Sequence, residues 1–305
     1  MEASMNHPHV LAGFNYLLGI TLAPLLLGII NRVKALFAGR TGPPLVQPYY
    51  DIVKLIAKGA VYSLTTSWIF RVSAPVCLGT ALIALLFVPF GGCAAPLAFG
   101  ADIVVLAYTL GLMRFFTIIA ALDTGSPFEG MGASREAFFS ALAEPALLLG
   151  VAALAAKTGW MSLSSMLPAV SPVGFEPLLV AAAFFIVFLC ENSRIPIDDP
   201  TTHLELTMIH EVMVLDHCGP DFGFIELASS IKLWILGAII VDIALPYKSG
   251  FWFVDCAEGI GAMFALAIVV GIMESAMARL RLLRVPQLLT AAGALSTIAL
   301  LLAVR

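Results

Sequence analysis

The chain has 305 residues, of which 60 % are hydrophobic and only 12 % carry a charge. A soluble domain carries roughly 25 % charged residues, because its surface must face water. This composition therefore excludes a water-soluble protein and predicts an integral membrane protein. The net charge of −4 gives no basis for a nucleic-acid partner.

Eight segments are apolar and long enough to cross a bilayer as helices, which takes about 20 residues each. We expect these spans near 10–30, 69–89, 101–121, 137–156, 177–191, 224–245, 259–278 and 286–304, the fifth being the shortest. The sequence thus predicts an all-α integral membrane protein of about eight transmembrane helices, forming a single polytopic membrane domain over 1–305.

The basic residues predict how these spans are oriented. An even number of spans places both termini on one side of the membrane. If that side is outside, the inner segments carry eleven Lys and Arg and the outer side only Lys157, Lys248 and Arg305. Because positive charge accumulates on the inner side, we expect both termini on the periplasmic side of the inner membrane. Three cytoplasmic docking loops are then expected near 31–68, 122–136 and 192–223.

Within the first of these loops, residues 48–58 (PYYDIVKLIAK) have an amphipathic pattern. Asp51, Lys54 and Lys58 fall on one face of a helix, and apolar residues separate them. We predict a short amphipathic helix that lies on the cytoplasmic surface of the membrane.

The five cysteines are scattered and none forms a C-x-x-C pair, so we expect no iron–sulfur cluster or zinc on this chain. Cys93 and Cys256 both fall on the predicted outer side, and a pairing between them stays open.

Several charged residues fall inside the predicted spans, where each costs about 2.5–3.5 kcal/mol on insertion scales. They are Arg114, Glu144, Lys232, Asp242 and Glu274. Pro145 follows Glu144 directly and frees a backbone carbonyl one turn back, which suits the entry of water. These charges indicate a function inside the membrane. The alternative is a structural ion pair between helices, such as Arg114 with Glu144, and it stays open here.

A second set of titratable residues follows the fifth span. Its acids are Glu191, Asp198, Asp199, Glu205, Glu211, Asp216, Asp221 and Glu226, and its histidines are His203, His210 and His217. On a continuous helix, histidines seven residues apart lie about 10.5 Å from each other, too far to share a metal ion. Neutral histidines among carboxylates are suited to passing protons. The alternative is a solvated loop with surface charges.

Four segments, at 42–58, 122–136, 191–211 and 274–282, resemble one family in the expected order. It is the membrane subunit of group 4 membrane-bound [NiFe] hydrogenases, the formate hydrogenlyase subunit 4 and hydrogenase-4 component C family. This family is homologous to subunit 1 of respiratory complex I, and the resemblance covers essentially the whole chain.

The resemblance implies a file of buried acids that opens where a cytoplasmic redox arm meets the membrane. Gly132, Arg135 and Glu144 match one motif of the family. A second motif matches Glu191, Arg194, Pro196, Asp198 and Glu205. The Q-P-x-x-D-x-x-K pattern of the surface helix supplies Gln47, Asp51 and Lys54 as residues for arm docking or for the cavity. Where complex I has glutamates, this chain has Thr201 and His203, which argues against a standard quinone-reducing subunit.

We therefore expect a non-catalytic membrane-arm subunit that anchors a redox arm and couples electron transfer to proton or Na⁺ translocation. The expected relay groups are Glu144, Glu191, Asp198, Glu205, Glu211, Asp216, Glu226, Glu274, His203 and His210. Their expected charge partners are Arg114, Arg135, Arg194 and Lys232.

The resemblance also implies which partners accompany this chain. They are hydrogenase large and small subunits, iron–sulfur subunits and antiporter-like membrane subunits, with the [NiFe] centre and the iron–sulfur clusters on those partners. Two alternatives remain. One is a quinone-interacting subunit 1 of an NADH dehydrogenase-like complex, although a bound quinone is not favoured. The other is a stand-alone transporter, for which the sequence shows no inverted repeat.

Overall fold

The computed structural model describes residues 8–170, 174–198, 208–245, 249 and 251–305. Within these residues the chain forms helices and no named strand. The α-helices are α1 (Pro8–Phe37), α2 (Gln47–Ile56), α3 (Trp68–Leu85), α4 (Asp102–Asp123), α5 (Pro127–Thr158), α6 (Leu163–Ala169), α7 (Phe175–Glu191), α8 (Pro220–Ala244), α9 (Trp252–Ala276) and α10 (Val285–Val304). Two short 3₁₀ helices, η1 (Glu211–Val214) and η2 (Leu282–Arg284), complete the described part.

Eight of these helices correspond to the eight predicted spans. Seven are long and apolar enough to cross a membrane by length and composition. The eighth, α7, has 17 residues and is the shortest, as expected. At 1.5 Å per residue it still reaches about 26 Å. The predicted all-α membrane fold is confirmed.

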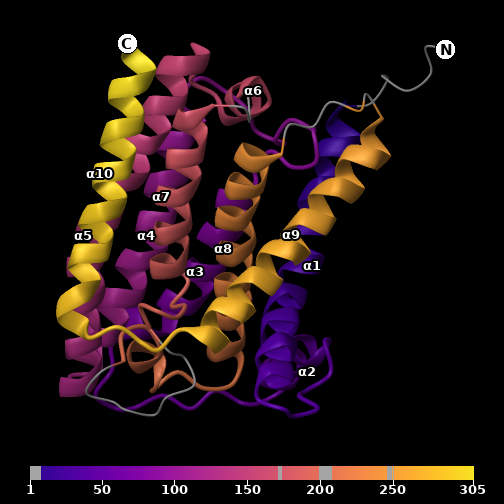
Figure 1. Ribbon diagram of the computed structural model, residues 1–305. Helices are drawn as coiled ribbons and strands as arrows, with labels where there is room; N and C mark the ends of the chain where they lie inside the picture. Colours follow the sequence, from indigo (N-terminus) through magenta and orange to yellow (C-terminus); the bar gives the residue numbers. More distant parts are fainter. Residues whose placement is uncertain (1–7, 171–173, 199–207, 246–248, 250) are drawn as a thin grey trace.

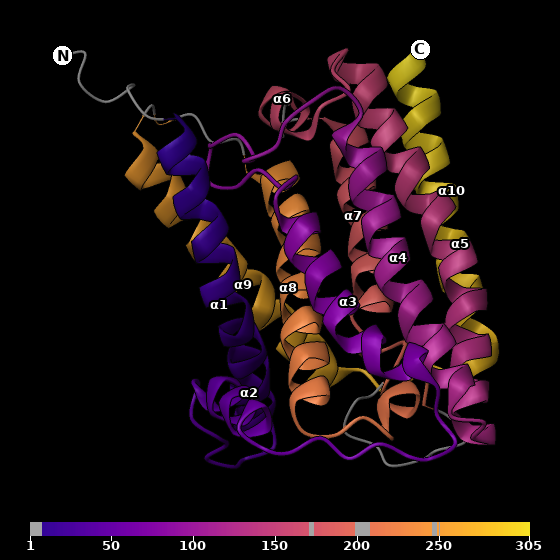
Figure 2. The same ribbon diagram turned by 180° about the vertical axis from the view of Figure 1, so that it is seen from behind.

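The helices pack as an elongated bundle around α8 (Figure 1). α8 contacts α1, α2, α3, α7 and α9, and 67 % of its most apolar stretch is buried, the largest share among the candidate spans. Its side chains Ile231, Trp234 and Ile235 belong to the fully buried core. On one flank α5, α7 and α10 pack together, and on the other α1 pairs with α9. Figure 2 shows α3 and α4 side by side from behind.

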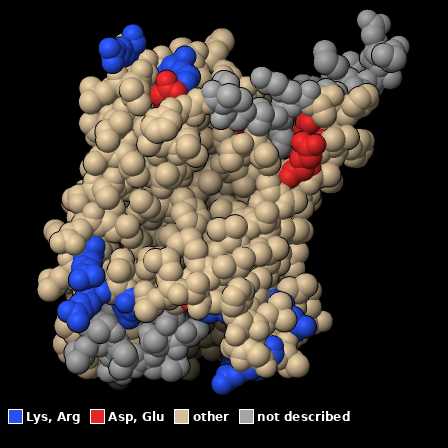
Figure 3. Space-filling model, viewed as in Figure 1, with Lys and Arg blue, Asp and Glu red and all other residues tan. Residues whose placement is uncertain are grey.

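The two ends of the bundle differ in charge. α1 begins and α10 finishes at the same end, whereas α2 lies at the other end (Figure 1), as an even number of spans requires. On the face shown in Figure 3, most Lys and Arg side chains gather at the end that carries α2. We call this end the basic end, and the end at which α10 finishes the opposite end.

One predicted loop is wrong. The segment near 122–136 is almost entirely helical, because α4 continues to Asp123 and α5 already begins at Pro127. The connection is short because Gly125 adopts a left-handed φ of +70°, which glycine tolerates without steric cost. Pro127 then occupies the first helical turn, where its missing N–H is not needed.

The amphipathic helix is confirmed but is shorter than predicted. α2 is Gln47–Ile56, so Lys58 lies beyond its end. Ile52 is buried, whereas Val53 and Ile56 are exposed. The apolar residues of α2 therefore do not all face the bundle.

Candidate functional site

A cavity of about 540 Å³ lies at the basic end, between α1, α2, α4, α5, α7, η1 and α8. Many of its lining side chains carry a charge or can titrate: Asp51, Arg114, Glu136, Glu191, Arg194, His210, Glu211, Glu226 and Lys232. Because a water molecule takes up about 30 Å³ in the liquid, the cavity has room for many of them. Many of the predicted relay groups therefore meet around a space that water can fill.

Arg114 of α4 is the centre of the buried ion pairs. Its two terminal nitrogens lie 2.6 Å from Glu191 Oε1 and 2.5 Å from Glu144 Oε1. Its Nε lies 3.3 Å from Glu136 Oε1. One arginine thus joins carboxylates from α5 and α7, and the planar guanidinium suits such multiple contacts.

Two further cations extend this cluster. Lys232 Nζ of α8 lies 2.9 Å from the second oxygen of Glu191. His210 Nε2 lies 3.0 Å from the second oxygen of Glu136. Each buried carboxylate therefore faces two cations, which is the arrangement that offsets the cost of removing charges from water.

Asp198 anchors the chain that follows α7. Its carboxylate lies 2.8 Å from Arg279 Nη2 and accepts hydrogen bonds from the backbone N–H groups of Ile209 and His210 at 3.1 and 3.2 Å. Burial acts to raise the pKa of Asp198, but His210 and Arg279 hold it below its usual value. Asp198 is therefore an ionised anchor at neutral pH.

His210 and Glu211 titrate at the cavity wall. Burial lowers the pKa of His210, but Glu136 and Asp198 outweigh it and raise the pKa to about 9. The imidazole is therefore a cation at neutral pH. Burial, followed by repulsion from Glu226 and Asp198, raises the pKa of Glu211 to about 7. Glu211 can therefore gain or lose a proton near neutral pH.

A second ion-paired cluster lies beside the first. Glu274 of α9 is fully buried and lies 2.9 Å from Lys34 Nζ of α1 and 3.4 Å from Arg194 Nη1. Arg194 also lines the cavity. Glu274 therefore borders the cavity indirectly, through Arg194.

Glu144 differs from the expectation. It was predicted to be buried, but its side chain is 54 % exposed on the outer surface of α5 while one oxygen contacts Arg114. The ion pair with Arg114 that the sequence left open is present. Glu144 therefore connects the buried cluster to the outside of the bundle.

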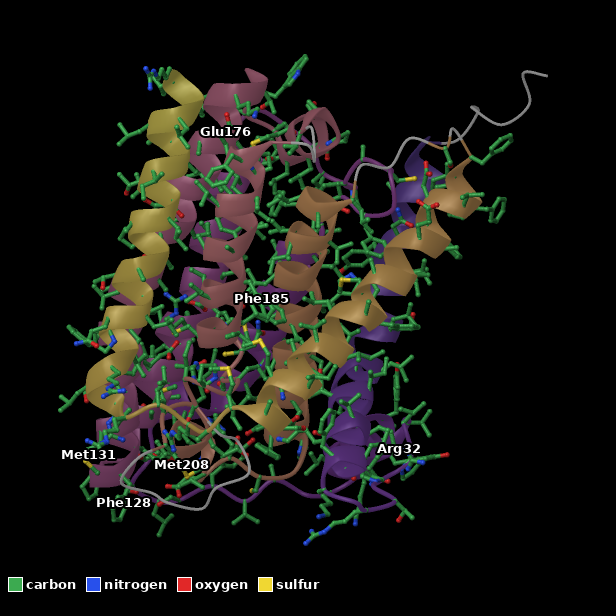
Figure 4. All side chains as sticks on the ribbon, viewed as in Figure 1. Arg32, Phe128, Met131, Glu176, Phe185 and Met208 are labelled. Atoms are coloured by element: carbon green, nitrogen blue, oxygen red, sulfur yellow. The ribbon has the colours of Figure 1, made fainter. Side chains whose placement is uncertain are left out.

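The remaining predicted residues fall into three groups. Asp216 is exposed, and its backbone N–H reaches Glu129, at 3.2 Å. Arg135 donates to the carbonyl of Met208 at 2.9 Å, near the start of α5 (Figure 4). On α2, Gln47 donates to Asp51 at 2.8 Å, Asp51 lines the cavity, and Lys54 is exposed. His203 and Glu205 lie outside the described residues.

Glu136 sits inside the cluster but was not among the residues predicted from the sequence. The wrong loop at 122–136 hid it, because a solvated loop gives no reason to select a glutamate. The sequence did contain a usable signal. If Gly125 marks the turn of a helical hairpin, Arg114 and Glu136 are each eleven residues from it, at matching heights on neighbouring helices. Lys34 and Arg279 were also missed as ion-pair partners.

Within the described ranges, no group of three or more His, Cys, Asp or Glu side chains is arranged to hold a metal ion. The cluster around Arg114 instead alternates acids and cations. This arrangement favours proton transfer along hydrated carboxylates over metal chemistry.

Comparison with known proteins identifies the family. Residues 11–304 match the NADH dehydrogenase family. Formate hydrogenlyase subunit 4 of Escherichia coli K12 is 32 % identical over 272 residues, covering 86 % of this chain and 87 % of the relative. Hydrogenase-4 component C of the same organism is 30 % identical over 231 residues, covering 75 % and 72 %.

A complex I relative and a solved structure agree with this result. A membrane subunit of the NADH-quinone oxidoreductase of Wolbachia pipientis wMel is 30 % identical over 274 residues, covering 76 % of this chain and 80 % of the relative. The fold matches a chain of the membrane-bound sulfane sulfur reductase, an archaeal respiratory membrane complex, with a TM-score of 0.84 at 20 % identity, covering 98 % and 100 %. The resemblance to the hydrogenase family is thus confirmed, and the chain belongs to the NADH dehydrogenase family of membrane subunits, as a homologue of formate hydrogenlyase subunit 4 and hydrogenase-4 component C.

Proposed function

We propose that this chain is a non-catalytic, proton-conducting coupling subunit in the membrane arm of a hydrogenase-type complex. The observation that carries the proposal is the continuity between the cavity at the basic end and the ion pairs around Arg114. These pairs lead from the cavity wall, through Glu191 and Glu136, to the exposed carboxylate of Glu144.

The proposed path begins at the cavity mouth and uses groups with different proton affinities. Glu211, with a pKa of about 7, exchanges protons with water in the cavity. Glu136 and Glu191 are held as carboxylates by their cations, so a proton that arrives there must weaken an ion pair. Weakening these pairs changes the charge that Arg114 presents to Glu144. A proton at the cavity is thereby linked to the outer surface of the bundle.

The partners and the orientation are part of the same proposal. The basic end faces the cytoplasm and carries the docked redox arm, and both termini face the outer side of the inner membrane. Hydrogenase large and small subunits and iron–sulfur subunits hold the [NiFe] centre and the clusters. Antiporter-like subunits cover the membrane surface that includes Glu144. The names of the two Escherichia coli relatives, formate hydrogenlyase subunit 4 and hydrogenase-4 component C, support this assignment.

The test is the variant Glu191→Gln in the intact complex. Loss of this carboxylate removes the bridge between Arg114 and Lys232. We expect ion translocation per electron to fall by more than about tenfold, a typical size for losing a proton-transfer group, while electron transfer on the partners persists. A pH-sensitive dye in sealed vesicles measures translocation, and the same assay with Na⁺ omitted separates H⁺ from Na⁺.

Two variants control for damage to the fold. Glu191→Asp keeps the carboxylate and should restore most of the translocation. Glu176→Gln removes a carboxylate that pairs with Lys157 at 2.6 Å near the opposite end (Figure 4), and it should leave translocation unchanged. A Glu191→Gln complex that assembles and pumps at full rate would show that the ion pairs only hold the bundle.

The cavity volume also favours a second candidate, a quinone-interacting subunit, because drug-sized ligands occupy pockets of about 300–1,000 Å³. Its lining combines the acids named above with apolar residues such as Met113, Ile225 and Leu233. Inhibition of the complex by quinone-site inhibitors, with protection by added quinone, would favour this second candidate over the hydrogenase-type assignment.

A further inference from the structure

The segment 86–101 fastens two parts of the bundle together at the opposite end. Toward that end α1 and α9 lean away from α8 (Figure 1). The segment is bound to the neighbourhood of α6, because Ala95 N donates to Ser164 Oγ at 2.9 Å. It is also bound to α1, because Asn15 Nδ2 donates to the carbonyl of Phe90 at 2.8 Å. It therefore bridges the place where the helices diverge.

The point of contact with α9 is a tight two-residue turn. Phe90 and Cys93 exchange backbone hydrogen bonds of 3.3 and 3.1 Å, and Gly91 and Gly92 between them have φ values of +58° and +73°. Two consecutive positive φ values are typical of a type I′ turn, in which glycine is favoured. A Cβ added at Gly91 would lie 2.9 Å from Cα and 3.4 Å from Cβ of Cys256. The turn thus rests directly on the first turns of α9, at Cys256.

The thiol of Cys93 is close to that of Cys256. Burial raises the pKa of Cys93, contacts with Asn15 lower it, and the charge on Cys256 raises it further, which requires that the two sulfur atoms lie near each other. Cys93 is partly exposed whereas Cys256 is buried. Both are free thiols in this structure. The other three cysteines lie elsewhere: Cys77 on α3, Cys190 on α7 and Cys218 beside Val61 at the basic end.

We propose that Cys93 and Cys256 form a disulfide that locks the segment 86–101 onto α9. A disulfide needs Cα atoms about 4.4–6.8 Å apart, and the seating of the 90–93 turn on Cys256 brings the two backbones to this range of approach. The proposal rests on the orientation given under the proposed function, because disulfides persist on the oxidising outer side of a bacterial membrane.

The oxidant belongs to the chemical class of disulfides, and the exchange balances. The partly exposed Cys93 thiolate attacks one sulfur of the oxidant and forms a mixed disulfide, and one thiolate of the oxidant leaves. The Cys256 thiolate then attacks the Cys93 sulfur, forms the Cys93–Cys256 bond and expels the second thiolate. The two cysteines lose two protons and two electrons, and the oxidant is reduced to two thiols.

The experiment counts free thiols in the intact complex. Right-side-out membrane vesicles are treated with oxidised glutathione, which does not cross the bilayer, and the protein is then denatured in the presence of N-ethylmaleimide. Intact-mass spectrometry of this subunit should show two fewer maleimides than in the sample reduced before labelling. Cys93→Ser and Cys256→Ser should each abolish the difference, whereas Cys218→Ser should preserve it.

Each outcome decides one part of the proposal. Full labelling after oxidation, in intact as well as in opened vesicles, overturns the disulfide, and so does a loss of labelling that survives Cys93→Ser. Protection that appears only after the vesicles are opened supports the disulfide and instead contradicts the proposed orientation.

Discussion

At the scale of single residues, the cluster around Arg114 is a balance of buried charges. Glu136 and Glu191 each have two cationic neighbours, and Arg114 serves both of them. Removing one member of such a group leaves an uncompensated charge, which typically costs about 3–5 kcal/mol. The same coupling allows a proton that arrives at one carboxylate to alter its neighbours. A cluster built for stability alone would not need a cavity with room for water beside it.

Glu211 gives the most direct test at this scale. Its pKa of about 7 in the folded protein exceeds the usual value of 4.5, so the folded chain keeps a proton that the unfolded chain has lost. This contribution to stability is complete below about pH 4.5 and disappears as the pH rises through 7. In the wild-type complex, we expect an infrared band of a protonated carboxyl group that titrates near pH 7 and is missing in Glu211→Gln.

The matched control is again Glu176→Gln, because that carboxylate pairs with Lys157 near the opposite end and lies far from the cavity. Its spectrum should keep the band near pH 7. A wild-type spectrum without any carboxyl titration between pH 5 and 8 would show that Glu211 is not the proton-exchanging group at the cavity.

At the scale of elements, close backbone contacts fix the walls of the cavity. A Cβ on Gly28 of α1 would lie 1.9 Å from the carbonyl oxygen of Leu45, just before α2. A Cβ on Gly132 of α5 would lie 2.8 Å from the carbonyl oxygen of Ile209, beside His210. Only glycine permits these approaches, so α2 and the segment before η1 are held against their helices by the absence of a side chain.

We therefore predict that Gly28→Ala displaces α2 and disturbs the cavity. The added methyl group meets backbone and not a flexible side chain, so we expect a destabilisation of about 1–3 kcal/mol and weaker retention of the soluble arm. Gly13→Ala is the matched control on the same helix, because nothing lies within 4 Å of its added Cβ. This control should be neutral or slightly stabilising, since alanine favours helix.

The measurement is the amount of soluble arm that copurifies with the tagged subunit, together with its thermal-denaturation midpoint. Equal values for Gly28→Ala and Gly13→Ala would contradict the tight seating of α2.

The sequence predicted the elements better than their contacts. All eight spans were found because hydropathy is a local property of the chain. The start of α5 was missed because residues 127–136 are too polar to resemble a span, although Ser126-Pro127 is a helix-start signal. The exposure of Glu144 was not predictable from the sequence alone, because it depends on which face of α5 packs against α7 and α10. Burial inside a span is a tertiary property.

At the scale of the whole molecule, the two ends have different tasks. The cavity, α2 and the ion-paired clusters lie toward the basic end, and the opposite end holds the start of α1, the end of α10 and the bridging segment 86–101. This polarity agrees with the charge bias in the sequence. A redox arm that supplies protons or conformational change must therefore bind at the basic end, where the acids line the cavity.

The orientation of the whole molecule leads to the final prediction. Lys58 is exposed at the basic end, just after α2, and Arg305 is exposed at the end of α10. In a cysteine-free background, Arg305→Cys should react with a membrane-impermeant maleimide in right-side-out vesicles. Lys58→Cys should react only in inverted vesicles from which the soluble arm has been removed, because positive loops stay on the inner side. The reverse pattern would place the cavity on the outer side. A redox arm in the cytoplasm would then be unable to reach it, and the proposed coupling role would fail with the orientation.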